Sequence, residues 1–248
     1  MTTDSASSAA TPTTLPTTTP TATSRPAAAL WDFDGTLVDT EPIWIAAEYD
    51  LIGGLGGEWN DEHAHQLVGN SLLESGAYIA NAIGRPDLEP AWIVDQLITQ
   101  VVDHIRTHPI PWRPGALELL SALREAGIRC ALVSASYRVL LDAAIARLPE
   151  GTFEVSVAGD EVTEGKPHPE PYVTAARLLD VDPRACVVFE DSPPGAQSGN
   201  AAGAMVVGIE HIVPLPRAPR RVVVDTLAGM DVPALLGLVE RLAADTDA

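Results

Sequence analysis

The sequence is poor in positive charge and lacks long apolar runs. It has 248 residues, of which 15 are Lys or Arg and 34 are Asp or Glu, so the formal net charge is −19. Nucleic acids and anionic membranes bind basic surfaces, so this balance argues against both as partners. No run of about 18 apolar residues occurs, which argues against a membrane-spanning helix.

Cysteine is also scarce, and the first residues carry no secretory signal. Cys130 and Cys186 both lie in apolar runs that are typical of buried strands, so we interpret them as small core residues rather than a disulfide framework. Residues 1–26 are almost entirely Thr, Ser, Ala and Pro. This composition predicts a disordered tail, because it offers little apolar surface to bury. We expect a cytoplasmic protein that is a monomer or a weak homodimer.

From Ala27 onward the pattern predicts an α/β fold. Short apolar runs alternate with amphipathic segments, which is typical of a Rossmann-like, doubly wound parallel sheet. One stretch, residues 41–110, contains only helical patterns separated by Gly and Pro, and it predicts an inserted α-helical cap domain. The core is then formed by residues 27–40 and 111–248. The core's predicted strands are the apolar runs at 27–34, 128–134, 153–159, 185–190, 204–209 and 221–225.

Polar side chains follow several of the predicted strands. Because the carboxyl ends of parallel strands meet at one edge of a sheet, these side chains are expected to converge there. The set comprises four carboxylates, one hydroxyl and the only lysine of the chain: Asp32, Asp34, Glu190, Asp191, Ser134 and Lys166. Carboxylates at one edge repel each other unless a cation lies between them, and oxygen ligands without His or Cys favour Mg²⁺.

These residue types together fit phosphoryl transfer. Asp32 and Asp34 are two positions apart at a strand end, so both can serve one reaction centre. Asp32 is the candidate nucleophile, which would form an aspartyl-phosphate, and Asp34 is the candidate general acid and base. Ser134 and Lys166 are candidates to hold the oxygens of the transferring phosphoryl group.

Four motifs in this order resemble the haloacid dehalogenase superfamily, in particular the subgroup that contains β-phosphoglucomutase and small-molecule phosphatases. The DxDGT segment at 32–36 is similar to the first motif, Ser134 to the second and Lys166 in GKPHPEPY to the third. Glu190 and Asp191 in FEDSPPG are similar to the fourth.

The resemblance implies roles for these residues and for the helical insert. Asp32 would be the nucleophile and Asp34 the acid/base. Mg²⁺ would be bound by Asp32, by the backbone carbonyl of Asp34 and by Asp191, with Glu190 supporting directly or through water. The insert would be a mobile cap that closes over the substrate and excludes water.

Five residues are further candidates for contact with the substrate. Trp44 follows the catalytic loop on the first predicted helix of the cap, and Asn70 and Ser71 lie in VGNSLL (68–73), which resembles the specificity loop of the family. Thr36 and Ser136 adjoin the first and second motifs. The substrate expected from the resemblance is a small phosphorylated metabolite.

Single residues distinguish this chain from other enzyme classes of the superfamily that it resembles. A phosphonatase needs a lysine in the cap, which this cap lacks, and Asp34 argues against the dehalogenase branch. In β-phosphoglucomutase a cap His, a cap-loop Arg and a Lys act at positions that hold Trp44, Leu72 and Tyr137 here. We therefore predict a Mg²⁺-dependent phosphatase that acts on a sugar or polyol phosphate. A phosphosugar mutase and a weakly catalytic module that binds phosphometabolites remain as alternatives.

Overall fold

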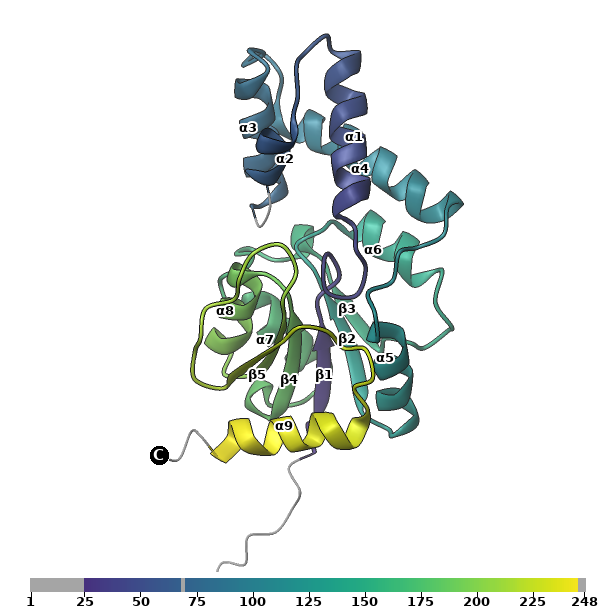
Figure 1. The fold of residues 1–248 in the computed structure, drawn as a ribbon, viewed down its shortest axis with the longest axis vertical. Coiled ribbons are helices and arrows are strands. Elements are labelled where there is room, and N and C mark those ends of the chain that lie inside the picture. Colours follow the sequence, from purple (N-terminus) through teal and green to yellow (C-terminus); the bar gives the residue numbers. More distant parts are fainter. Residues whose placement is uncertain (1–24, 68–69, 245–248) are drawn as a thin grey trace, which may run out of the picture.

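The computed structural model describes residues 25–67 and 70–244, so the predicted tail lies outside the described residues except for its last two positions. Figure 1 shows a core built around a sheet, with a group of helices standing above one edge of that sheet. This upper group, which we call the cap, consists of α1 to α4, and these helices lie within residues 41–110.

Six parallel strands form the sheet of the core, in the order β3-β2-β1-β4-β5-β6. The strand that enters first, β1, lies at the centre, and the chain winds outward from it in both directions. This arrangement confirms the predicted doubly wound fold. The strands are β1 (Ala28–Trp31), β2 (Arg129–Val133), β3 (Val155–Val157), β4 (Cys186–Glu190), β5 (Met205–Ile209) and β6 (Arg221–Val224).

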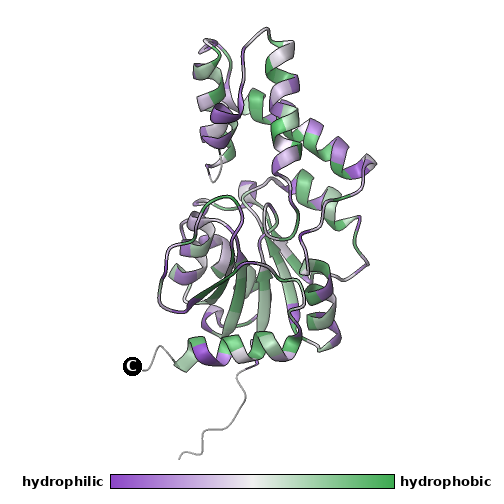
Figure 2. Ribbon diagram, viewed as in Figure 1, coloured by the Kyte–Doolittle hydropathy of each residue, from purple (hydrophilic) through white to green (hydrophobic). Residues whose placement is uncertain are grey.

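Helices cover both faces of the sheet, so its central strands are apolar on both sides. In β1, Ala29 and Trp31 pack into one core cluster with α5, α6 and α9, whereas Ala28 and Leu30 pack into a second cluster with α7 and α8. Figure 2 shows this apolar sheet between its two helical layers. The helices are α5 (Ala116–Glu125), α6 (Arg138–Ile145), α7 (Glu170–Leu178), α8 (Pro193–Ala201) and α9 (Val232–Ala244).

The two cysteines lie inside this core, as predicted. Cys130 is on β2 and Cys186 is on β4, and both are buried free thiols. Burial raises the pKa of each thiol to about 12, because the thiolate would lose its hydration in the apolar interior. Neither cysteine is therefore reactive at neutral pH.

The cap is a bundle of four helices in which α4 packs against α1 and α3. Helix α4 also packs against α6 of the core. None of the helices among the described residues is both long and apolar enough to span a membrane. The cap helices are α1 (Glu41–Gly54), α2 (Asp61–His65), α3 (Leu72–Ala82) and α4 (Pro90–Thr107).

Two segments join the cap to the core, and they lie side by side. The first follows β1 and the second precedes α5. Val38 in the first segment forms β-bridges with Asp34 and with Trp112 in the second. The turn between Asp34 and α1 is therefore held next to the carboxyl end of β1, where the site described below is built.

Candidate active site

The carboxyl ends of three central strands bring several of the predicted catalytic and metal-binding residues together. Asp32 follows β1, Ser134 follows β2 and Glu190 is the last residue of β4. Lys166 comes from the loop that follows β3 and reaches back across the sheet edge. The convergence that the sequence pattern predicted is therefore present in the fold.

Lys166 is the centre of a buried ionic network. Its Nζ donates to Asp32 Oδ1 at 2.5 Å, to Glu190 Oε1 at 2.7 Å and to the carbonyl oxygen of Val133 at 3.0 Å. The side chain is only 6% exposed. Burial opposes the charge of the ammonium, but the carboxylates of Asp32 and Glu190 outweigh it and hold the pKa of Lys166 above its usual value.

Glu190 is fully buried, and its two oxygens are occupied by protein donors. Besides Lys166, Oε1 accepts from the hydroxyl of Tyr172 at 2.9 Å. Oε2 accepts from the backbone N–H groups of Asp191 and Ser192 and from the Ser192 hydroxyl. Glu190 thus lies behind Lys166 and holds it in place.

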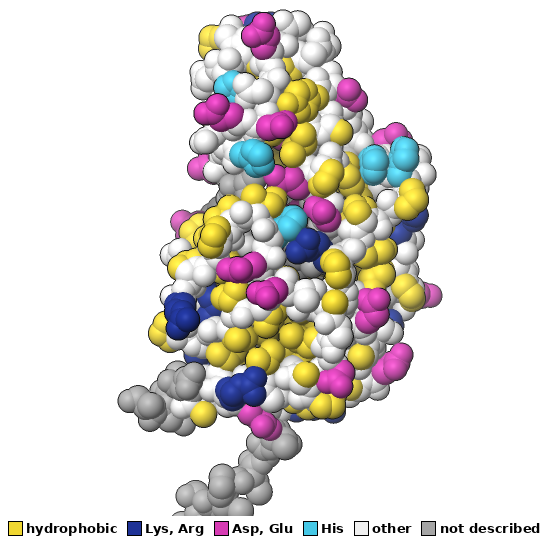
Figure 3. All heavy atoms as spheres, in the orientation of Figure 1, with side chains coloured by type: hydrophobic (Ala, Val, Ile, Leu, Met, Phe, Trp, Pro, Cys, Tyr) yellow, Lys and Arg dark blue, Asp and Glu magenta, His cyan; other side chains and the backbone are white. Residues whose placement is uncertain are grey.

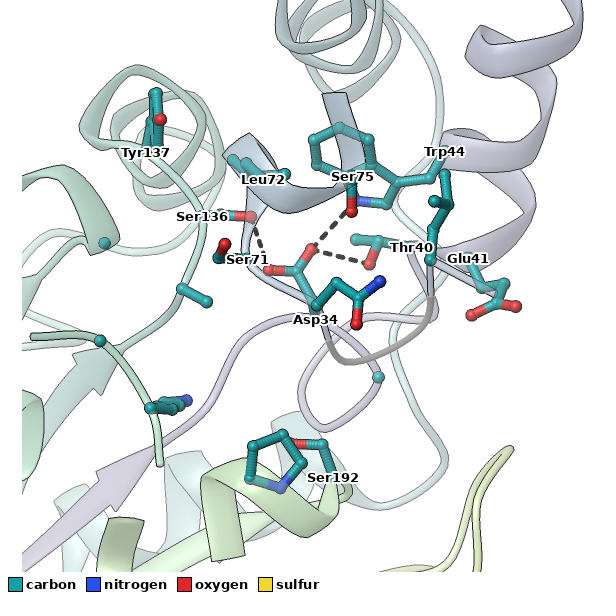
Figure 4. Close-up of a pocket in the computed structure, with 18 of the residues that line it drawn as sticks. Asp34, Thr40, Glu41, Trp44, Ser71, Leu72, Ser75, Ser136, Tyr137 and Ser192 are labelled. Atoms are coloured by element: carbon teal, nitrogen blue, oxygen red, sulfur yellow. Dashed lines mark hydrogen bonds between the residues drawn. The ribbon is translucent and has the colours of Figure 1, made fainter. Parts of the chain in front are cut away.

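Asp34 is held by four donors that come from both sides of the site. Its Oδ2 accepts from Ser134 Oγ at 3.0 Å and from Ser136 Oγ at 2.8 Å. Its Oδ1 accepts from Thr40 Oγ1 at 2.8 Å and from Trp44 Nε1 at 3.3 Å. Figure 4 shows the Asp34 carboxylate between Ser136 of the core on one side and Thr40 and Trp44 on the other.

Three carboxylates lie close enough to share a cation. Ligand atoms of Asp32, Glu190 and Asp191 are all within 4.8 Å of one another. Burial raises the pKa of Asp32 well above its usual value, with the charge of Glu190 adding to the effect, and burial also raises the pKa of Asp191. Lys166 balances only one of the three charges. The all-oxygen donor set and the missing positive charge both fit Mg²⁺.

Two glycines make room for this acidic group. A Cβ on Gly35, whose φ is +83°, would lie 2.1 Å from Asp191 Oδ2. A Cβ on Gly195 would lie 1.7 Å from Glu190 Oε1. The backbone must approach both carboxylates closely, and only glycine permits that approach.

A cavity of about 520 Å³ opens from this site toward the cap. The nucleophile and acid/base candidates, Asp32 and Asp34, line its core end, together with Lys166 and Asp191. Four of the five predicted substrate contacts also line it: Trp44, Asn70, Ser71 and Ser136. Positions 68–69 of the predicted specificity loop lie outside the described residues.

Thr36 is placed differently from the prediction. Its side chain is fully buried, it does not line the cavity, and its hydroxyl donates to Asp191 Oδ1 at 2.9 Å. Thr36 therefore orients a candidate metal ligand, and its side chain does not face the cavity. Ser71 also has a structural role, because it is the N-cap of α3. Its side chain accepts from the Glu74 backbone N–H, and the Glu74 side chain accepts from the Ser71 backbone N–H.

Among the residues that line the cavity and that the sequence analysis did not single out are His211, Glu41, Glu48 and Asp160. His211 follows β5, with Nδ1 3.6 Å from Asp191 Oδ2 and Nε2 3.5 Å from Asp39 Oδ1. The rule that functional groups follow parallel strands could have identified His211. Glu41 and Glu48 come from α1, and no motif marks them.

Comparisons with known proteins agree with this geometry. A family model described as haloacid dehalogenase-like hydrolase matches residues 26–203. Hexitol phosphatase A of Escherichia coli (strain K12) is 33% identical over 190 residues, which cover 76% of this chain and 85% of that protein. The bifunctional riboflavin kinase/FMN phosphatase of Arabidopsis thaliana is 31% identical over 75% of this chain, which spans about half (49%) of that protein's length.

A solved structure extends the likeness to the fold. CbbY from Rhodobacter sphaeroides, solved in complex with phosphate, superposes with a TM-score of 0.75 at 27% identity. The match covers 85% of this chain and 99% of that one. A variant of the same protein was solved with xylulose-(1,5)bisphosphate. The family model spans well over half of the sequence, and the chain therefore belongs to the haloacid dehalogenase-like hydrolases.

Proposed function

We propose that this protein is a Mg²⁺-dependent phosphatase that hydrolyses a small phosphorylated metabolite through an aspartyl-phosphate on Asp32. The observation that carries the proposal is the meeting of Asp32, Asp34 and Lys166 at the floor of one cavity. Relatives whose names state a phosphatase activity support the same reaction class.

In the first step the Asp32 carboxylate attacks phosphorus. Oδ1 is held by Lys166, whereas Oδ2 has no hydrogen-bond partner among the described residues and is free to attack. The new O–P bond forms as the bond from phosphorus to the ester oxygen breaks. The departing alkoxide takes a proton from Asp34, which acts as general acid.

In the second step water hydrolyses the aspartyl-phosphate. Asp34, now ionised, removes a proton from the water as its oxygen attacks phosphorus, and the bond from phosphorus to Asp32 breaks. Inorganic phosphate is released and both carboxyl groups return to their first state. Ser134 was expected to hold a phosphoryl oxygen, but it is buried and does not line the cavity, so we assign it to orient Asp34 through Oδ2, as Ser136 does. Lys166 supplies positive charge to the phosphoryl oxygens.

Mg²⁺ would be held by Asp32 and Asp191, with Glu190 supporting from behind. When bound, it would neutralise the carboxylates and the anionic oxygens of the substrate. The binding pocket for the rest of the substrate supports a sugar or polyol monophosphate. Lys166 is the only Lys or Arg among the described residues that line the cavity, so a second phosphate group would find no cation there.

The same observation weighs against a phosphosugar mutase. Trp44, Leu72 and Tyr137, which occupy the positions of the mutase's His, Arg and Lys, all line the cavity. None of the three can carry a positive charge, so the intermediate of a mutase, which has two phosphate groups, would lack its second anchor.

The test is phosphate release from a panel of sugar, polyol and nucleotide monophosphates, with Mg²⁺ and with EDTA. We expect Mg²⁺-dependent turnover of some of the panel. Asp32→Asn should lower kcat by at least about 10³-fold and abolish the acid-stable phosphoenzyme that rapid quenching traps. Asp103→Asn, which changes an exposed carboxylate on α4, is the matched control. Full activity of Asp32→Asn would refute the nucleophile, and no release from any ester would refute the phosphatase.

A further inference from the structure

The first helix of the cap presents an unusual face to the cavity. Residues 41, 44, 45 and 48 are spaced as one stripe of a helix, and all four line the cavity. Two of them, Glu41 and Glu48, are carboxylates. Helix α1 therefore places two carboxylates in the wall of the cavity.

Glu48 is the more deeply placed of the two carboxylates. It is only 5% exposed, and its Oε2 accepts from Trp59 Nε1 at 3.1 Å. Its Oε1 has no hydrogen-bond partner among the described residues, and no Lys, Arg or His there forms an ion pair with Glu48. Burial raises the pKa of Glu48 to about 7, and the charge of Glu41 adds to the effect. A buried carboxylate without a counter-ion is costly unless a ligand supplies one.

Glu48 is placed where the alcohol part of a bound phosphate ester would lie. Trp44 reaches Asp34, the candidate acid/base, and Glu48 lies one helical turn farther along α1, about 6 Å along the helix axis. A substrate whose ester oxygen is near Asp34 would extend its alcohol part toward Glu48. Lys166, the only Lys or Arg among the described residues that line the cavity, and His211 both lie beside the acidic cluster at the phosphate end.

The surroundings of Glu48 on α1 are acidic and aromatic, a combination that suits a cation. Trp44 precedes Glu48 by one helical turn and lines the same cavity, and an aromatic side chain near a carboxylate favours an ammonium group. The cap as a whole, residues 41–110, has eleven Asp and Glu and only two Arg, neither of which lines the cavity. Figure 3 shows acidic and histidine side chains around the waist where the cap meets the core, with a basic side chain on the core side of it.

We propose that the cavity selects phosphate monoesters whose alcohol part carries a protonated amine, such as an amino sugar or an amino polyol, with Glu48 as the counter-ion of that amine. The proposal deepens the phosphatase activity proposed above and rests on it. The phosphate of such a substrate faces Lys166, and its ammonium group faces Glu48, so each end of the substrate meets the opposite charge. An anionic alcohol part would be repelled by Glu48 and by Glu41.

The test compares matched pairs of esters that differ by one amine in place of one hydroxyl. Glucosamine 6-phosphate with glucose 6-phosphate is one pair, and 2-amino-2-deoxyglucitol 6-phosphate with glucitol 6-phosphate is the other. The full chain is assayed at pH 7.5 with saturating Mg²⁺, and kcat/KM is measured for each ester. A charge-assisted hydrogen bond to a buried carboxylate predicts a preference for the amine of about 10- to 100-fold.

Two variants separate the role of Glu48 from the general charge of the cap. Glu48→Gln keeps the shape and the acceptor for Trp59, and it should lower kcat/KM for the amine ester at least tenfold more than for the hydroxyl ester. Glu58→Gln removes an exposed carboxylate from the same domain and should leave the ratio of the two esters unchanged. A purely structural role of Glu48 would change both esters equally.

The outcomes distinguish this proposal from the one on which it rests. Turnover of the hydroxyl esters without any preference for the amines refutes the role of Glu48 and leaves the phosphatase standing. A preference that survives in Glu48→Gln also refutes it. No hydrolysis of any ester in either panel refutes the phosphatase, and this inference with it.

Discussion

Replacing Glu48 by Gln should stabilise the cap, and the gain should depend on pH. Glu48 is buried in the cap wall with one protein donor and no counter-ion among the described residues. Its ionised form is therefore disfavoured in the folded state, whereas in the unfolded chain it is hydrated. Gln has the shape of the protonated acid and carries no charge at any pH.

The magnitude follows from the two pKa values of this carboxyl. The usual value is 4.5, and burial raises the pKa in the folded protein to about 7. A carboxyl whose pKa is raised on folding contributes its stability at pH below 4.5, and that stability is lost as the pH rises through about 7. A difference of about 2.5 units corresponds to roughly 3 kcal/mol. The advantage of Glu48→Gln should be about 1 kcal/mol at pH 5 and about 3 kcal/mol at pH 8.

Urea unfolding at pH 5 and pH 8, without ligand, measures this difference. Tryptophan fluorescence suits the assay, because Trp59 donates to Glu48 and Trp44 lies on the same helix. Glu58→Gln, in an exposed position, is the control and should show no comparable dependence on pH. An equal effect of Glu48→Gln at both pH values would refute the reasoning, since a packing change alone does not titrate.

The other predictions concern the core end of the site. Asp34→Asn should lower kcat by about 10²- to 10⁴-fold at saturating substrate, because the leaving alkoxide and the attacking water lose their acid and base; a loss below tenfold would contradict that role. Gly195→Ala should destabilise the protein by about 1–3 kcal/mol in urea unfolding, although Ala usually favours a helix, because its Cβ would collide with Glu190; a stabilised variant would contradict the close approach. Thr36→Val removes the hydroxyl that orients Asp191, so the Mg²⁺ concentration for half-maximal activity should rise about 10- to 100-fold. An unchanged Mg²⁺ requirement would argue that Asp191 does not bind the ion.

Much of the fold and of the core end of the site could be predicted because both depend on local rules. Strands buried on both faces are nearly continuous apolar runs, and the residues that follow them must meet at one edge of a parallel sheet. That geometry alone brings Asp32, Ser134 and Glu190 together. Lys166 could be identified by its motif and because it is the only lysine in the chain.

The cap wall of the cavity could not be predicted in the same way. Which face of α1 meets the cavity depends on how α1 packs against α4, and no local pattern encodes that packing. Glu48 therefore looked like one acidic residue among many on a helix. The direction of the Thr36 hydroxyl is a similar case, because it depends on the position of Asp191, 155 residues away in the chain.

The single lysine also gives the protein a built-in chemical reporter. Apart from the α-amino group, Lys166 is the only primary amine, and it is buried and tied to two carboxylates. Acylating reagents need an accessible, unprotonated amine, and the folded site provides neither. Each acylation of Lys166 detected by mass spectrometry would therefore record one opening of the site around it. The rate of that acylation, with and without phosphate, would measure how often the site opens.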